Sequence, residues 1–137
     1  MKRYVLLVLT CLSFSVMATE EIVDCNDPKN TIEINECAIS ELGSAKAELR
    51  KYLEAGFERH AGDATLIASI KVAQEDWRAY MASHCNSVYT QWRDGTIRGL
   101  MAISCKTKLT KQRSHEIWDN FLTYMDSTPP VLPEPKE

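Results

Sequence analysis

The fold is decided by the stretch Gln74–Cys85, which reads QEDWRAYMASHC. In and around it, apolar residues recur at steps of three and four, the spacing that places side chains on one face of an α-helix. This face carries two aromatic rings and ends in a thiol. We therefore expect a core-facing helix that a disulfide bond holds near its far end. The members of the stripe are Ile70, Ala73, Trp77, Tyr80, Met81, Cys85 and Val88.

Two more segments keep the same helical spacing, one on each side of this helix. The first begins at Asn30 or Thr31, either of which can cap a helix, and continues to about residue 57. The central helix covers about residues 64–89, and the third covers Leu100–Met125. Between them, residues 91–99 contain an Asp-Gly pair and a second glycine, which indicates a loop. We expect an all-α fold, with a hairpin of the first two helices and a third helix packed across it.

The two ends of the chain differ from this helical region. Residues 1–18 combine a basic start, an apolar segment and small residues before Ala18, which predicts a secretory signal peptide cleaved after that residue. Its removal leaves 14 basic and 19 acidic side chains, a net charge of −5. Residues 19–126 form the expected helical domain. Residues 127–137 hold four prolines, so we expect a disordered tail.

Four cysteines remain after cleavage, and an even number in an exported chain of this size predicts two disulfide bonds. In an antiparallel hairpin folded near Ala61, Cys37 lies 24 residues before that point and Cys85 lies 24 residues after it. With a constant rise per residue, the two lie level on neighbouring helices. This favours Cys37–Cys85 together with Cys25–Cys105. Cys25–Cys37 with Cys85–Cys105, and Cys25–Cys85 with Cys37–Cys105, remain open.

The residue patterns favour no catalytic or metal chemistry. The three histidines are scattered along the chain, and no nucleophile or phosphate-loop motif is present. The acidic pairs Glu33–Glu36 and Glu75–Asp76 fit surface charge better than a glycosidase pair, because three short helices rarely build a cleft. The basic run of residues 106–113 fits a solvated helix face better than a nucleic-acid site in an acidic exported chain. We expect no enzyme, no metal and no cofactor.

Several spaced motifs together resemble a known family. They are Thr31-x-x-x-Asn35-x-Cys37, Gln74-x-x-Trp77-x-x-Tyr80-x-x-x-x-Cys85, Gly95-Thr96, and Cys105-x-x-x-Leu109-Thr110-x-x-Arg113. From about residue 25 to 117, this pattern resembles the lysozyme inhibitor LprI-type N-terminal domain of exported bacterial proteins. The chain departs from the usual pattern at Met81, where the family usually has Arg, and at Thr96, where it often has Ser.

The resemblance implies a small helical, disulfide-bonded protein, periplasmic or secreted, that binds and blocks lysozyme. It supplies no catalytic residues. It implies a structural role for the motif positions Asn35, Gln74, Trp77, Tyr80, Gly95, Leu109, Thr110 and Arg113.

The expected partner is a basic cell-wall hydrolase, whose cleft the domain would occlude. Lysozymes are commonly basic, so a chain of net charge −5 is steered towards them. The residues of the 91–99 loop that we expect to bind are Trp92, Arg93, Asp94 and Arg98, because aromatic and arginine side chains are enriched in interfaces. Arg93 and Arg98 are the candidates to reach the active-site carboxylates. For Trp92 the alternative is that it covers the end of the core.

Two other functions fit the same sequence: an immunity protein against a delivered periplasmic toxin, and an envelope structural or assembly factor. We expect no nucleic-acid partner and no membrane anchor. The oligomeric state does not follow from the sequence.

Overall fold

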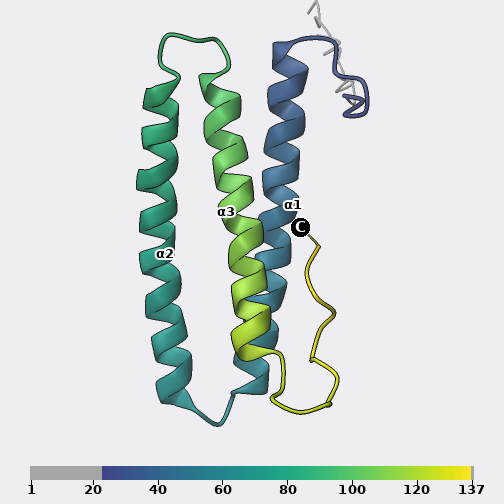
Figure 1. Ribbon diagram of the computed structural model, residues 1–137, viewed down its shortest axis with the longest axis vertical. Helices are drawn as coiled ribbons and strands as arrows, with labels where there is room; N and C mark the ends of the chain where they lie inside the picture. The colour runs from purple at the N-terminus through teal and green to yellow at the C-terminus, as the bar shows by residue number, and fades with distance from the viewer. Residues whose placement is uncertain (1–22, 137) are drawn as a thin grey trace, which may run out of the picture.

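The computed structural model describes residues 23–136 and contains three long helices, with no strand in that range. Helix α1 spans Thr31–Arg59, α2 spans Ala64–Gln91 and α3 spans Arg98–Phe121. The chain runs down α1, up α2 and down α3 (Figure 1). The all-α prediction is confirmed. The expected signal peptide, residues 1–18, lies outside the described residues.

The first two helices begin at side-chain caps, and the third does not. The Asn30 side chain accepts hydrogen bonds from two amides in the first turn of α1, at 2.9 and 3.1 Å. Glu33 reaches back from that turn and accepts a hydrogen bond from the amide of Lys29 at 2.6 Å. Asp63 caps α2 in the same way. Ile97 precedes α3 and offers no side-chain cap, so the preceding turn and the packing of α3 fix its start.

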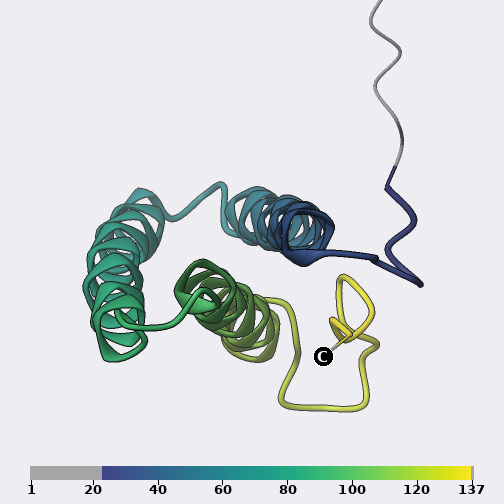
Figure 2. The ribbon, with the colours of Figure 1, turned by 90° about the horizontal axis from the view of Figure 1, so that it is seen from above.

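Helix α3 packs against both other helices, whereas α1 and α2 contact each other little. Seen from above, α3 lies against α1 on one side and α2 on the other (Figure 2). Helices α1 and α3 run parallel. At the end where both finish, Arg59 of α1 donates hydrogen bonds to the carbonyls of Phe121 and Thr123 at 2.9 and 2.7 Å. These bonds satisfy carbonyls that the end of α3 would otherwise leave open.

The main apolar core lies in the half of the bundle nearest the α1–α2 connection. Its buried members are Leu49, Tyr52, Leu53, Ile70, Ile117 and Leu122. Closer to the start of α3, the buried contact face consists of small polar side chains, those of Thr107, Thr110 and Ser114. Each hydroxyl donates to the carbonyl four residues earlier, at 3.1, 2.7 and 3.2 Å. These bonds satisfy the hydroxyls within α3 itself, so its neighbours need supply no polar partner.

The disulfides are Cys25–Cys37 and Cys85–Cys105, with Cα–Cα distances of 5.5 and 5.7 Å. The favoured pairing, Cys37–Cys85 with Cys25–Cys105, is therefore wrong, and an alternative left open by the sequence is correct. The favoured pairing assumed that α1 and α2 pack side by side along their length. Because α2 packs on α3 instead, Cys85 meets Cys105.

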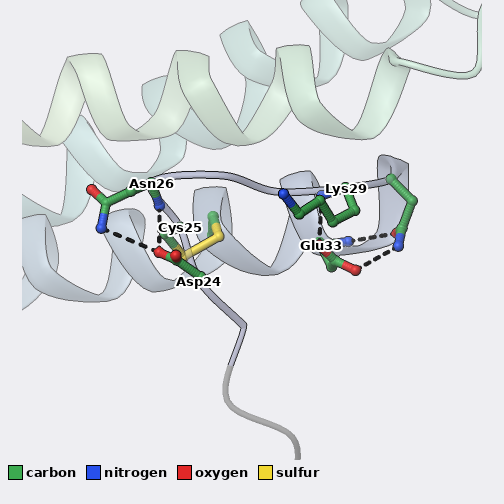
Figure 3. The surroundings of a disulfide bond; sticks show 7 residues. Asp24, Cys25, Asn26, Lys29 and Glu33 are labelled. Carbon is green, nitrogen blue, oxygen red and sulfur yellow. Dashed lines mark hydrogen bonds between the residues drawn. A yellow bond between two sulfur atoms is a disulfide. The ribbon is translucent and has the colours of Figure 1, made fainter.

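The lead-in segment is tied back to α1 by the first disulfide (Figure 3). Asp24 accepts a hydrogen bond from the amide of Asn26 at 2.9 Å and forms a tight turn around Cys25. Lys29 pairs with Asp27 on the surface. The bridge therefore orders a polar segment that has little apolar surface of its own.

The disorder expected for residues 127–137 is not confirmed. The tail runs back along α1 and α3, on the side away from α2 (Figures 1 and 2). Prolines exclude a helix here, but an extended segment needs only a few donors and acceptors, which the helices provide. Three hydrogen bonds involve the backbone of the tail: Val131 N donates to Leu122 O at 2.9 Å, Trp118 Nε1 donates to Leu132 O at 2.9 Å, and Tyr52 Oη donates to Pro133 O at 2.7 Å.

Candidate partner-binding surface

Both disulfides lie at the same end of the bundle, opposite the main apolar core. Cys37 is in the second turn of α1, Cys105 is in the second turn of α3, and Cys85 is near the end of α2. The core residues cluster towards the other end of the three helices. Covalent bonds therefore hold the half of the molecule that has the smaller apolar core.

The α2–α3 connection, Trp92–Ile97, crosses this end and is closed by backbone hydrogen bonds. Trp92 N donates to Val88 O at 3.3 Å, and Gly95 N donates to Trp92 O at 2.9 Å. The Cys85–Cys105 bridge joins the two helices about two turns before and two turns after the connection. Gly95 does not have a positive φ, so the turn does not depend on a conformation that only glycine favours. The connection is thus a short, doubly anchored loop.

Three large apolar side chains are exposed around this loop. Tyr89, Trp92 and Ile97 keep 38%, 40% and 39% of their surface accessible to solvent. Exposed aromatic side chains on a fixed loop are typical of protein interfaces. Trp92 is thus neither fully buried nor fully exposed, and its role in binding stays a prediction.

The two arginines at this end, Arg93 in the connection and Arg98 at the start of α3, are held differently. The Arg98 guanidinium lies 5.2 Å from the centre of the Tyr89 ring and donates to the carbonyl of Arg93 at 3.3 Å. Arg98 therefore braces the loop through a cation–π contact and a hydrogen bond. Arg93 makes a 3.9 Å contact with the carboxylate of Asp94, and both side chains are largely exposed. Such an exposed pair is weak, so it does not fix the Arg93 side chain.

We call the six residues Tyr89, Trp92, Arg93, Asp94, Ile97 and Arg98 the disulfide-end surface. The sequence pointed to four of them and missed Tyr89 and Ile97. Tyr89 continues α2 beyond the apolar stripe, and Ile97 directly precedes α3. The signal that could have identified these two residues is their apolar side chains on either side of a Gly-containing loop.

The start of α1 brings negative charge to the same end. Asn35 of α1 lies beside Gly99, in the first turn of α3, so the two helix starts are neighbours. The lead-in and the first turns of α1 carry the acidic residues Asp24, Asp27, Glu33 and Glu36, against the single base Lys29. This acidic border favours approach by a basic partner.

Most of the family-motif positions lie between the helices and away from this surface. Gln74 is buried and accepts a hydrogen bond from Arg113 Nε at 3.1 Å, and Arg113 also contacts Glu116 at 2.8 Å. Thr110 is fully buried, with its hydroxyl 3.7 Å from the sulfur of Met81. The Met that replaces the family's usual Arg thus packs at the α2–α3 interface.

The remaining motif positions vary in burial. Trp77 packs partly buried against the core, and Leu109 is half-buried on α3. Tyr80, expected in the core, is 55% exposed and stacks on His84 at 5.5 Å. Helix α2 has only one main neighbour, so its buried stripe is narrow, and Tyr80 and Ala73 fall outside it. Asn35 is half-buried, with a side-chain oxygen that has no hydrogen-bond partner among the described residues.

The Tyr52 phenol and the Asp126 carboxyl, which both lie near the tail, have shifted pKa values. Burial, and then the nearby Glu48 carboxylate, raise the pKa of the Tyr52 phenol above its usual value. Hydrogen bonds from the side chain and then the amide of Thr128 lower the pKa of Asp126. Neither group belongs to the disulfide-end surface.

Within residues 23–136, no group of His, Cys, Asp and Glu side chains is arranged to hold a metal ion. Over the same residues, no helix has the length and hydropathy needed to cross a membrane. Of the acidic residues considered above, Glu33 accepts a hydrogen bond from the amide of Lys29 at the start of α1, and Glu36, Glu75 and Asp76 are exposed.

The fold and this surface define a small all-α protein, held by two disulfides, with a fixed and exposed aromatic and arginine end. The chain belongs to the lysozyme inhibitor LprI family, whose sequence profile matches residues 25–117. This is a class of non-catalytic inhibitors, and membership implies a lysozyme-type hydrolase as protein partner. Membership and the two disulfides indicate an extracellular or periplasmic protein.

An uncharacterized protein of Rhizobium meliloti (strain 1021) is 24% identical over 120 residues, which cover 80% of this chain and 86% of that protein. No solved structure matches the chain.

Proposed function

We propose that this protein is an exported inhibitor that blocks the active-site cleft of lysozyme, or of a related cell-wall hydrolase, with its disulfide-end surface. The observation that carries the proposal is the exposed Trp92–Arg93 pair on a loop anchored by the Cys85–Cys105 bridge. A loop that is already fixed loses little conformational entropy on binding.

Each part of the surface has a distinct role in this proposal. Trp92, flanked by Tyr89 and Ile97, supplies the apolar contact area at the mouth of the cleft. Arg93 leaves its exposed contact with Asp94 and pairs with a catalytic carboxylate, where desolvation strengthens the interaction. The acidic start of α1 and the net charge of −5 expected after cleavage speed association with a basic enzyme.

The experiment is a cell-wall clearing assay with lysozyme and increasing amounts of the purified, oxidised protein. We expect the clearing rate to fall as the protein approaches molar excess. Replacing a hot-spot residue of an interface weakens binding by about 2 kcal/mol or more, so Trp92→Ala and Arg93→Ala, as the proposed hot spots, should each raise the inhibition constant about 30-fold.

Arg78→Ala is the matched control for Arg93→Ala. It removes the same charge from an exposed position in the middle of α2, away from the surface. Equal effects of the two substitutions would show that net charge, and not the loop, governs binding. Undiminished clearing at a large molar excess of the unaltered protein would contradict the proposal itself.

A further inference from the structure

The C-terminal segment 128–136 is bound on the helices as a peptide ligand would be. It runs alongside α1 and α3, on the side away from α2 (Figure 2). Leu132 packs against the main core, and Pro135 is buried. None of the residues that hold the segment belongs to the disulfide-end surface.

Aromatic side chains of the groove recognise two successive carbonyls of the segment. Trp118 Nε1 donates to Leu132 O at 2.9 Å, and Tyr52 Oη donates to Pro133 O at 2.7 Å. His115 lies 5.3 Å from the Trp118 ring and contacts the carboxylate of Glu134 at 2.8 Å. Donation by aromatic side chains to the carbonyls of an extended proline-rich segment is a mode that other peptide-binding grooves use.

The groove does not end where the segment ends. Beside Pro135 and Lys136, it continues into an open cavity of about 790 Å³ between α1 and α3. Lys108 and Lys111 line this continuation, and Lys111 pairs with Glu41 at 3.0 Å. Glu41 and Glu116 line it as well, so the continuation carries charges of both signs and leaves room for a peptide that extends past Pro135.

The connection to the segment is exposed, so the segment can leave, which uncovers the part of the core that Leu132 packs against. Residues 124–130 are exposed, and the Met125 side chain extends fully into solvent. The segment is held through its own few contacts, and the hydrogen bonds within α1 and α3 do not depend on it.

We propose that this groove is a binding site for an extended segment of a partner protein with the pattern Leu-Pro-acidic-Pro, and that the chain's own tail fills it in the free protein. We call the site, formed by Tyr52, His115 and Trp118 with Lys108 and Lys111, the tail groove. The tail competes with the partner segment because its tether gives it a high effective concentration.

The first experiment measures binding of a labelled synthetic peptide with the sequence of residues 128–136, by fluorescence anisotropy. The full-length oxidised protein is compared with a full-length variant carrying Leu132→Ser and Pro135→Ser, whose tail is weakened. We expect the variant to bind the peptide at least about tenfold more tightly than the unaltered chain, because the competing tether is gone. Circular dichroism establishes that the variant is folded.

Tyr52→Phe in the same variant removes one donor and keeps the ring. We expect it to weaken peptide binding by roughly 3- to 10-fold, the usual effect of one hydrogen bond. Tyr80→Phe is the matched control, since that phenol is exposed on α2 and should leave binding unchanged. A folded tail variant that binds no better than the unaltered chain, or that is insensitive to Tyr52→Phe, overturns the proposal.

A second measurement uses the unaltered chain and does not depend on any variant folding. Excess peptide should displace the tail and speed hydrogen exchange of the Val131 amide, which donates to Leu122 O. Unchanged exchange at saturating peptide overturns the proposal. If the unaltered chain instead dimerises by exchanging tails, measured by light scattering, the occupant is a second copy and the assignment to a partner protein is overturned.

Discussion

Reducing the Cys85–Cys105 bridge should weaken both the fold and the inhibition, because the bridge anchors the loop that we propose binds. A variant carrying Cys25→Ser and Cys37→Ser retains only this disulfide. Comparing its oxidised and reduced forms changes one covalent bond and almost no packing. The bridge closes a chain segment of 20 residues.

The magnitude follows from the entropy of closing that segment in the unfolded chain. For a 20-residue separation the loss is about 3 kcal/mol of unfolding free energy. For a domain of this size, such a loss lowers the melting temperature by about 10–15 °C. The core residues near the α1–α2 connection are unaffected, so the reduced form should still fold at 25 °C.

The assay combines urea unfolding with the lysozyme clearing assay on both forms. We expect the inhibition constant to rise at least about tenfold on reduction, because the freed loop must be ordered again on binding. The comparison is a variant with Cys85→Ala and Cys105→Ala, which keeps only Cys25–Cys37. Its reduction should cost a similar stability, because the separation of 12 residues is also short, but should change inhibition little. Equal inhibition by the oxidised and reduced forms of the first variant, both folded, would refute the reasoning.

Three further predictions concern stability. Arg113→Ala should lower the free energy of unfolding by about 1–3 kcal/mol, because it leaves the buried amide oxygen of Gln74 without its donor. Arg78→Ala, on the exposed face of α2, should change the free energy of unfolding little, and equal losses in urea unfolding would argue against the buried pair. Leu122→Ala should cost about 2–5 kcal/mol, since this side chain is fully buried, and a loss below about 1 kcal/mol would contradict its place in the core. The pKa of the Tyr52 phenol is raised in the folded chain, so the phenol ionises more easily in the unfolded chain. Its contribution to stability should therefore stay constant below about pH 10 and decline as the pH rises further. Tyr52→Phe should reduce that decline in a pH series of unfolding curves.

The positions of the helices followed from the sequence, but their contacts did not. Apolar spacing and caps place the three helices to within a few residues, because both signals are local. The same spacing shows which side of a helix faces inward without showing which helix it meets. For that reason the level positions of Cys37 and Cys85 were uninformative, and Tyr80 was placed in a core that α2 does not fully enter.

The binding features were only partly visible for the same reason. The loop residues Trp92 and Arg93 stood out by composition. The tail groove could not be foreseen, because Tyr52 meets Pro133 across 81 residues of chain. Proline content correctly excluded a helix there, but it carries no information about distant donors.

The central position of α3 has a consequence for how the chain acquires its structure. Helices α1 and α2 emerge first during synthesis, yet they contact each other little and offer no stable subassembly. Closure must await α3, whose pairing with α1 spans more than sixty residues along the chain. The helical domain therefore stays open until α3 has been made.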